Sequence, residues 1–450
     1  MMFKALAISL TVVPLTQAYM GSNPAARGFQ QHAATRNLDA LHEPHFRRNV
    51  GGVFIATGSP PTSEQTAAQS LDPVYECTPY NYEPILKLEP SYPQEWMTAT
   101  IQPNDTEAKE AFARINATVA QLLPNDHIHP SYGHLGNWTP AAEAYNWTDP
   151  DCWWTWSGCT KPNPALGIPD DLISVPEPNT WGLAFDDGPN CSHNAFYDYL
   201  QANELKATMF YIGSNVFNWP FQAMRGLDDG HHICCHTWSH QYMTSFTNEE
   251  VFAELWYSRK ILQDILNITV SCWRPPYGDV DNRVRLIAKE MNLTTFMWDH
   301  DTEDWKVNIS GVTPQDIYNN YQNVIDGAGN GTYDDHGTIT LTHELTNWTM
   351  STFIHEAPNI MQAFKHVVPL ASAFNWTHPY IGSDITYPTF EEFVSKGQSS
   401  ANSTVNTTKT ASESSAPTLK SDKSQTGSAG RTVAIGGLWM IASCLAALVV

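Results

Sequence analysis

Basic residues are scarce in this chain of 450 residues. It carries 24 lysines and arginines against 46 aspartates and glutamates, a formal net charge of −22 at pH 7. Proteins that bind nucleic acid use clustered positive charge to neutralise phosphates, so this shortage excludes nucleic acid from the expected partners. The same charge is compatible with a neutral or a cationic polymer as the partner.

Apolar residues are almost absent between Gln398 and Gly430, where serine, threonine, alanine and lysine dominate. A segment of this composition cannot bury enough apolar surface to offset the conformational entropy that it would lose on folding. We therefore expect residues 396–430 to form a disordered, O-glycosylated stalk.

Apolar runs mark both ends of the sequence. Lys4 precedes the apolar stretch Ala5–Leu15, and small residues follow up to Ala18, which predicts a secretory signal peptide over residues 1–18. Residues 431–450 are mainly apolar behind a small and polar segment, which is typical of a GPI attachment tail. A transmembrane helix is the alternative, because the run is close to the minimum length of a span. We expect a secreted protein held at the outer face of the plasma membrane.

The cysteine count is odd once the C-terminal tail is set aside. Of eight cysteines, Cys444 lies in that tail, so at least one of the others stays unpaired or joins another molecule. Cys152 and Cys159 bracket a short tryptophan-rich loop, and we predict a disulfide between them. The pairing of the remaining five stays open: Cys77, Cys191, Cys234, Cys235 and Cys272.

Acceptor sites for N-linked glycans, Asn-x-Ser/Thr, recur along the chain. Their number, in a chain with a secretion signal, predicts glycosylation at the surface. The sites are Asn104, Asn116, Asn137, Asn146, Asn190, Asn267, Asn292, Asn308, Asn330, Asn347, Asn375, Asn402 and Asn406.

The pattern of the chain changes near residue 180. Residues 19–75 are expected to be a disordered leader or propeptide, and residues 76–178 a loop-rich flank. From residue 179 to residue 395, short apolar runs alternate with amphipathic segments. A capping box of Thr247 and Glu250 opens the clearest predicted helix, Asn248–Leu266, and another opens at Thr313. Strands are predicted at Trp181–Phe185, Ala207–Ile212, His232–Cys235, Thr294–Trp298, Thr338–Thr342 and His366–Leu370, and near Cys272.

This alternation defines the expected fold class. Strands that alternate with helices indicate a parallel α/β sheet, and about seven such units suit a closed or partly closed barrel. In barrels of this kind, the chemistry gathers at the C-terminal ends of the strands. The polar motifs of this chain should therefore meet at one edge of the sheet.

Two pairs of polar residues follow predicted strands. Asp186 and Asp187 end the first strand, and because successive side chains point to opposite sides, one can bind a metal while the other acts as a base. His236 and His240 follow a later strand, and their separation of four predicts that both imidazoles lie on one face of a helical turn. With Asp187 they would form a metal site of two histidines and one carboxylate. Each pattern alone is also common as a turn or a surface pair.

Three further groups complete an ordered set: Arg274–Tyr277, Asp301–Trp305 and Leu341–His343. In this order the groups match all five motifs of the NodB-type polysaccharide deacetylases, carbohydrate esterase family 4. The chain resembles fungal, basidiomycete-type chitin deacetylases from about Cys77 to Phe393. This resemblance implies a distorted (β/α) barrel and one divalent metal ion, usually zinc, with cobalt or manganese as alternatives. The stretches that carry it are Trp181–Leu200, Gly230–Tyr242, Trp273–Arg283, His343–Met350 and Asp151–Trp156.

The resemblance assigns the metal site and the base by position. Asp187, His236 and His240 resemble the metal ligands, Asp186 resembles the general base, and Arg274 resembles the residue that orients Asp186. Amide hydrolysis needs such a set, because a metal that polarises the carbonyl and acidifies a water supplies both activation and the nucleophile. The base then removes the proton of that water.

The resemblance also assigns the opposite side of the site. His343 resembles the general acid and Asp304 its partner, which would keep the imidazole cationic until it protonates the leaving amine. The backbone N–H of Tyr277 would bind the oxyanion. Leu341 and Trp305 resemble the walls of the pocket for the acetyl methyl group.

The expected activity is metal-dependent hydrolysis of the N-acetyl groups of cell-wall chitin to chitosan and acetate. The expected partners are chitin or chito-oligosaccharides and a membrane reached through a GPI anchor. Two alternatives remain: the same chemistry on peptidoglycan or acetylated xylan, and a noncatalytic wall-binding protein.

Trp153, Trp154 and Trp156 either stack on sugar rings or pack in the core. Cys234 and Cys235 directly precede His236, and a thiol so close to a metal is expected to affect redox sensitivity.

Overall fold

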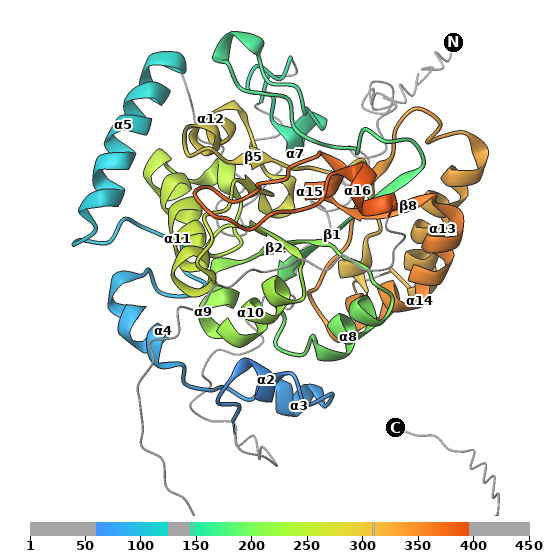
Figure 1. Ribbon diagram of the computed structural model, residues 1–450. Coiled ribbons are helices and arrows are strands. Elements are labelled where there is room, and N and C mark those ends of the chain that lie inside the picture. The colour runs from blue at the N-terminus through green and yellow to red at the C-terminus, as the bar shows by residue number, and fades with distance from the viewer. Residues whose placement is uncertain (1–59, 125–144, 147, 308, 310, 396–450) are drawn as a thin grey trace, which may run out of the picture. The chain divides into compact units, whose positions relative to one another are not determined.

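The computed structural model describes residues 60–124, 145–146, 148–307, 309 and 311–395 (Figure 1). The predicted signal peptide, most of the predicted leader, the stalk and the C-terminal tail lie outside these residues. Within the described ranges, no helix has the length and apolar character needed to cross a membrane. The acceptor sites Asn137, Asn308, Asn402 and Asn406 also lie outside them.

A sheet of eight strands, in which all the paired strands run parallel, forms the centre of the fold (Figure 1). The strand order is β5-β4-β3-β2-β1-β7-β6, and β8 pairs with the first half of β1. The predicted α/β class, a distorted (β/α) barrel, is confirmed. The strands are β1 (Thr180–Gly188), β2 (Thr208–Tyr211), β3 (His232–Cys235), β4 (Cys272–Trp273), β5 (Thr294–Thr295), β6 (His300–Asp301), β7 (Thr338–Leu341) and β8 (His366–Pro369).

The strand β1 is buried along its whole length. The Phe185 ring lies 4.9 Å from that of Phe196 in α8 and 4.8 Å from that of Phe353 in α14, centroid to centroid. Burying a side chain of this size stabilises the fold by about 1.5–3 kcal/mol. A buried strand covered by helices is what the centre of a parallel sheet requires, and it fixes where the carboxylates at its end emerge.

Helices follow the strands and cover the sheet. As predicted, α11 begins after Thr247, which forms a capping box with Glu250. The helix predicted from Thr313 is α13, which has its own capping box. The helices of this part are α8 (Asn194–Ala202), α9 (Gly213–Asn218), α10 (Pro220–Asp228), α11 (Asn248–Leu266), α12 (Asn282–Glu290), α13 (Pro314–Asn330), α14 (Asn347–Ala363), α15 (Leu370–Ala373) and α16 (Phe390–Ser395).

One predicted strand is shorter than expected. The run Thr294–Trp298 gives only β5, and beyond it Phe296 forms an isolated parallel bridge with Leu172 of the flank, where Met297 N donates to Leu172 O at 2.8 Å. The chain then forms β6, which was not predicted. The flank is thus part of the barrel wall at this edge.

The N-terminal flank is more helical than expected. The segment predicted to be loop-rich contains α5 (Thr106–Leu122), whose buried Ala108, Ile115 and Val119 face α11 and α12. The end of the predicted leader also packs on the barrel, since Asn194 Nδ2 donates to Ala67 O at 2.7 Å. The end of the leader, predicted to be disordered, forms α2 (Glu64–Ala67) and α3 (Pro73–Glu76), and the other helices of the flank are α4 (Glu83–Leu88) and α7 (Trp154–Ser157).

Three disulfides link the described part of the chain. The predicted bond between Cys152 and Cys159 is confirmed, and the others join Cys77 to Cys191 and Cys234 to Cys272. Cys235 is the unpaired cysteine of the described residues. It is fully buried, and burial raises the pKa of its thiol to about 12, so the thiol stays protonated at neutral pH.

Candidate active site

The side chains proposed as metal ligands lie together at the C-terminal edge of the sheet. Asp187 comes from the end of β1, and His236 and His240 come from the segment that follows β3. Asp187 Oδ1 lies 3.0 Å from His240 Nε2 and 3.4 Å from His236 Nε2. One ligand atom from each residue lies within 4.8 Å of the others. Two imidazole nitrogens and a carboxylate oxygen suit zinc and similar divalent ions.

The polar environment of this cluster also fits a cation. Asp187 Oδ1 is buried, and none of the described groups satisfies it with hydrogen-bond geometry. Burial alone would raise the pKa of Asp187, but the imidazole of His240 and then that of His236 hold this pKa well below its usual range. His236 Nδ1 donates to the carbonyl oxygen of Arg274 at 2.7 Å, which leaves Nε2 as the ligand atom. The residues present therefore fit a divalent ion.

The prediction that His236 and His240 lie on one helical turn is wrong. The segment from His236 to His240 is irregular, with left-handed φ angles of 65° at Thr237 and 54° at His240. A loop and a helical turn can both bring together residues four apart, so spacing alone could not distinguish them. The loop geometry needs support from elsewhere, which the long helix α11 provides.

Glu254 of α11 holds the segment His236–His240, the ligand loop, through hydrogen bonds. Its Oε2 accepts from the backbone N–H groups of Trp238 at 2.9 Å and Ser239 at 2.8 Å, and its Oε1 accepts from Ser239 Oγ at 2.6 Å and Ala99 N at 2.8 Å. Glu254 is fully buried. Sequence analysis missed this residue, although a glutamate between the apolar Val251 and Leu255 was a usable signal.

The proposed base, Asp186, lies beside the metal ligands. Its Oδ2 is 3.7 Å from His236 Nε2, and its Oδ1 accepts from Arg274 Nη1 at 2.7 Å. Arg274 is fully buried and stacks over the Phe210 ring at 4.2 Å, so the guanidinium is held in one orientation. Both carboxylates reach the site because the register of β1 shifts after Asp186 and Asp187 takes a left-handed φ of 73°.

The proposed acid, His343, faces the base across a strand pair. It pairs with Asp186 in an isolated parallel bridge just beyond β7. His343 Nδ1 lies 2.6 Å from Asp304 Oδ1, and its backbone N–H donates to Asp304 Oδ2 at 3.0 Å. Burial alone would lower the pKa of His343, but the buried Asp304 carboxylate outweighs it and raises this pKa to about 10. The imidazole is therefore a cationic proton donor at neutral pH.

The residues proposed to contact substrate lie around the same edge. The Tyr277 ring is half-buried, 4.8 Å from the His240 ring, and Leu341 ends β7. Trp305 is half-buried in a 3₁₀ helix, η8 (Asp304–Lys306). Trp153 and Trp154, by contrast, are buried, so the alternative that these two stack on sugar rings is wrong. Trp156 is half-buried, with its ring 5.5 Å from that of Tyr145, and for this residue both alternatives stay open.

A second buried carboxylate supports the loop after β1. Glu344 Oε1 accepts from Asn190 N at 2.8 Å and lies 3.0 Å from His193 Nδ1, while Oε2 accepts from Tyr197 OH at 2.9 Å. Burial raises the pKa of Glu344 to about 8. Sequence analysis missed this residue too, because its partners lie about 150 positions away and leave no local pattern.

Comparison with known proteins agrees with this site. The profile of the polysaccharide deacetylase family matches residues 174–296. Chitin deacetylase 2 of Cryptococcus neoformans var. grubii is 54% identical over 349 residues, which cover 78% of this chain and 76% of the relative. Chitin deacetylase of Amylomyces rouxii is 45% identical over 71% of this chain and 75% of its own length. This chain therefore belongs to the polysaccharide deacetylase family, on its fungal chitin deacetylase branch.

Among solved structures, the chain is similar to a chitin deacetylase from Colletotrichum lindemuthianum. It is 18% identical and covers 46% of this chain and 92% of its own, with a TM-score of 0.42. The family generally depends on a divalent metal ion, which the cluster of Asp187, His236 and His240 suits.

Replacing Glu254 tests its support of the ligand loop. Glu254→Gln replaces one carboxylate oxygen with an amide N–H, which cannot accept the hydrogen bonds that Trp238 N and Ser239 N donate. We therefore expect zinc affinity to fall about 10- to 100-fold, the usual effect of removing a group that orients metal ligands. Titration of the metal-free protein with zinc against a chelator measures this. Glu250→Gln, at the exposed start of the same helix, is the matched control and should leave the affinity unchanged. Equal affinities for both variants would contradict the assignment.

Replacing Asp304 tests the cationic acid. The folded-state pKa of His343 is raised to about 10, so the imidazole stays protonated until the pH exceeds that value. Asp304→Asn removes the negative charge that raises it, and the imidazole should lose its proton at a lower pH. We expect the alkaline limb of the kcat profile to move down by one unit or more, measured as acetate release against pH. An unmoved alkaline limb in the folded variant would refute this role.

Proposed function

We propose that this protein hydrolyses the N-acetyl groups of chitin, releasing acetate and leaving chitosan. One observation carries the proposal: a metal-ligand cluster, a carboxylate base and a histidine acid meet at one edge of the sheet, where β1, β3 and β7 end. The similarity to proteins named chitin deacetylase, at 45–54% identity over most of the chain, supports chitin as the substrate.

The residues of the chain divide the reaction between them. A divalent ion at Asp187, His236 and His240 would polarise the amide carbonyl and acidify a water. Asp186 takes the proton of that water, and Arg274, whose Nη1 donates to Asp186 Oδ1, keeps the carboxylate oriented.

Tyr277 and His343, on the other side of the site, act on the oxyanion and on the leaving amine. The backbone N–H of Tyr277 stabilises the oxyanion of the tetrahedral intermediate. His343, cationic beside Asp304, gives its proton to the amine as the carbon–nitrogen bond breaks. The base then carries one proton and the acid has lost one, so a proton returned through solvent restores both.

We propose zinc as the metal, with cobalt or manganese as substitutes, because two imidazoles and one carboxylate with open positions are typical of catalytic zinc. We further propose secretion and GPI anchoring at the outer face of the plasma membrane and the cell wall. The signal and tail patterns of the sequence support this location. Three disulfides suit the oxidising compartment through which such a protein passes.

A substrate comparison tests the activity. Purified protein should release acetate from chitin oligosaccharides faster than from acetylated xylan or peptidoglycan, and a chelator should abolish release until zinc is added back. Faster release from acetylated xylan or peptidoglycan would overturn the choice of substrate. Release that survives complete metal removal would overturn the mechanism.

A variant of Asp186 tests the base. Asp186→Asn keeps the shape of the side chain but cannot take a proton, so kcat should fall about 10²- to 10⁴-fold. Zinc content should stay near that of the unaltered protein, because Asp187 and the two histidines are kept. Acetate release at the unaltered rate would rule out Asp186 as the base.

A further inference from the structure

The turn that follows β4 has an unusual backbone. In the 3₁₀ helix η7 (Pro276–Gly278), Tyr277 has a left-handed φ of 58°, and Gly278 has a φ of 69°. A left-handed φ is strained for an aromatic residue and persists only when the surrounding structure holds it. Gly278 is pressed against the Trp154 ring, since a Cβ there would lie 2.2 Å from it. The flank therefore touches the turn directly.

Asp279 is the acceptor that fixes this turn. Its Oδ1 accepts from Trp153 Nε1 at 2.9 Å and Thr155 Oγ1 at 2.7 Å, and its Oδ2 accepts from Thr244 N and Thr244 Oγ1, both at 2.8 Å. The side chain is fully buried. Four donors on one buried carboxylate tie three segments together: the tryptophan loop, the turn after β4, and the chain just beyond the ligand loop.

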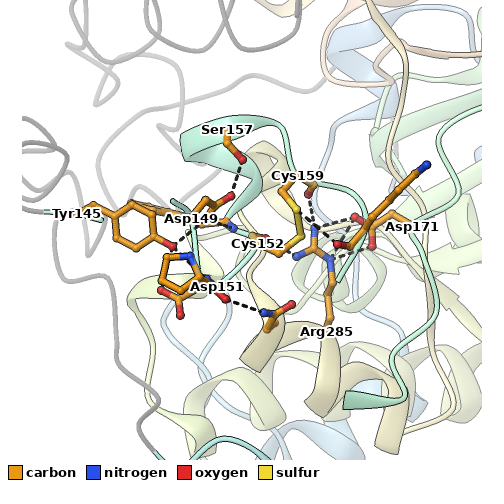
Figure 2. The surroundings of a disulfide bond; sticks show 12 residues. Tyr145, Asp149, Asp151, Cys152, Ser157, Cys159, Asp171 and Arg285 are labelled. Carbon is orange, nitrogen blue, oxygen red and sulfur yellow. Dashed lines mark hydrogen bonds and ion pairs between the residues drawn. A yellow bond between two sulfur atoms is a disulfide. The ribbon is translucent and has the colours of Figure 1, made fainter. Parts of the chain in front are cut away.

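The tryptophan loop that presents two of these donors is itself fixed, as Figure 2 shows. The disulfide between Cys152 and Cys159 closes it. Arg285 of α12 donates to Cys152 O at 2.6 Å and to Cys159 O at 2.8 Å, and it is bound to Asp171 through Nη2 at 2.7 Å. Arg285 and Asp171 are both buried, so the loop is anchored on the helix that begins three residues after Asp279.

We propose that Asp279 is a positioning residue that holds the Tyr277 turn in the conformation needed to bind the oxyanion, with Trp153 and Thr155 as its fixed partners. This inference rests on the proposed function, in which the Tyr277 N–H stabilises the transition state. An oxyanion donor acts on the transition state rather than on bound substrate, so a loosened turn lowers kcat and leaves KM nearly unchanged. The disulfide-closed flank thereby becomes part of the catalytic apparatus.

Graded variants separate positioning from general stability. Asp279→Asn should lower kcat about 10- to 100-fold, since a displacement of about 1 Å at a reacting centre has effects of this size. Thr155→Val removes one donor without changing side-chain shape and should lower kcat severalfold. Thr155→Ser keeps the hydroxyl, so its kcat should match that of the unaltered protein. Thr352→Val in α14, a buried threonine whose hydroxyl makes no hydrogen bond among the described groups, is the matched control and should leave kcat unchanged.

Two further readouts distinguish a displaced turn from a loss of folding or of bound metal. Affinity for a phosphonate that mimics the tetrahedral intermediate should fall in parallel with kcat, while KM for chitin oligosaccharides stays within about twofold. Zinc affinity should match that of the unaltered protein. Variants that lose thermal stability but keep kcat, or that lose kcat and zinc affinity together, would overturn the inference. An unaltered protein that releases no acetate would instead refute the proposed function.

Discussion

The site depends on the parallel pairing of β1 with its neighbours. Parallel strands end at the same edge, so a β1 that pairs with β2, β7 and β8 delivers Asp186 and Asp187 to the edge where the loop after β3 arrives. The bridge between Asp186 and His343 continues this pairing and sets the base opposite the acid. The separation between the two proton-transfer groups is thus a property of the sheet rather than of a loop.

Buried acidic side chains hold the loops at this edge of the sheet in place. Glu254 holds the histidine loop, Glu344 holds the loop after β1, and Asp279 holds the turn of Tyr277. An unpaired buried carboxylate would cost several kcal/mol. Glu254 and Asp279 each accept four hydrogen bonds that offset the lost hydration, and Glu344 accepts two, from Asn190 N and Tyr197 OH, with His193 Nδ1 3.0 Å away. Their partners include backbone N–H groups of the loops, at Trp238, Ser239, Asn190 and Thr244, so the loops lose freedom where catalytic geometry is needed.

Sequence patterns predicted every strand except β6, and the helix Asn248–Leu266, because apolar periodicity and capping residues are local signals. The same patterns also indicated which polar residues follow the C-terminal ends of the strands. The geometry of the loops was not predictable in this way: the segment from His236 to His240 depends on Glu254, and the Tyr277 turn on a flank more than 120 positions earlier. The helix α5 was missed although Ala108, Ile115 and Val119 recur at helical spacing, since the many prolines and tryptophans of the flank favoured loops.

All of this chemistry requires that Asp187, His236 and His240 bind one divalent ion. X-ray absorption at the zinc edge of the zinc-loaded protein measures its ligands. We expect one zinc per chain with two imidazole nitrogens and oxygen ligands at about 2.0–2.2 Å, and the loss of one imidazole nitrogen in His240→Ala. A sulfur ligand at about 2.3 Å, or a spectrum unchanged in that variant, would contradict it.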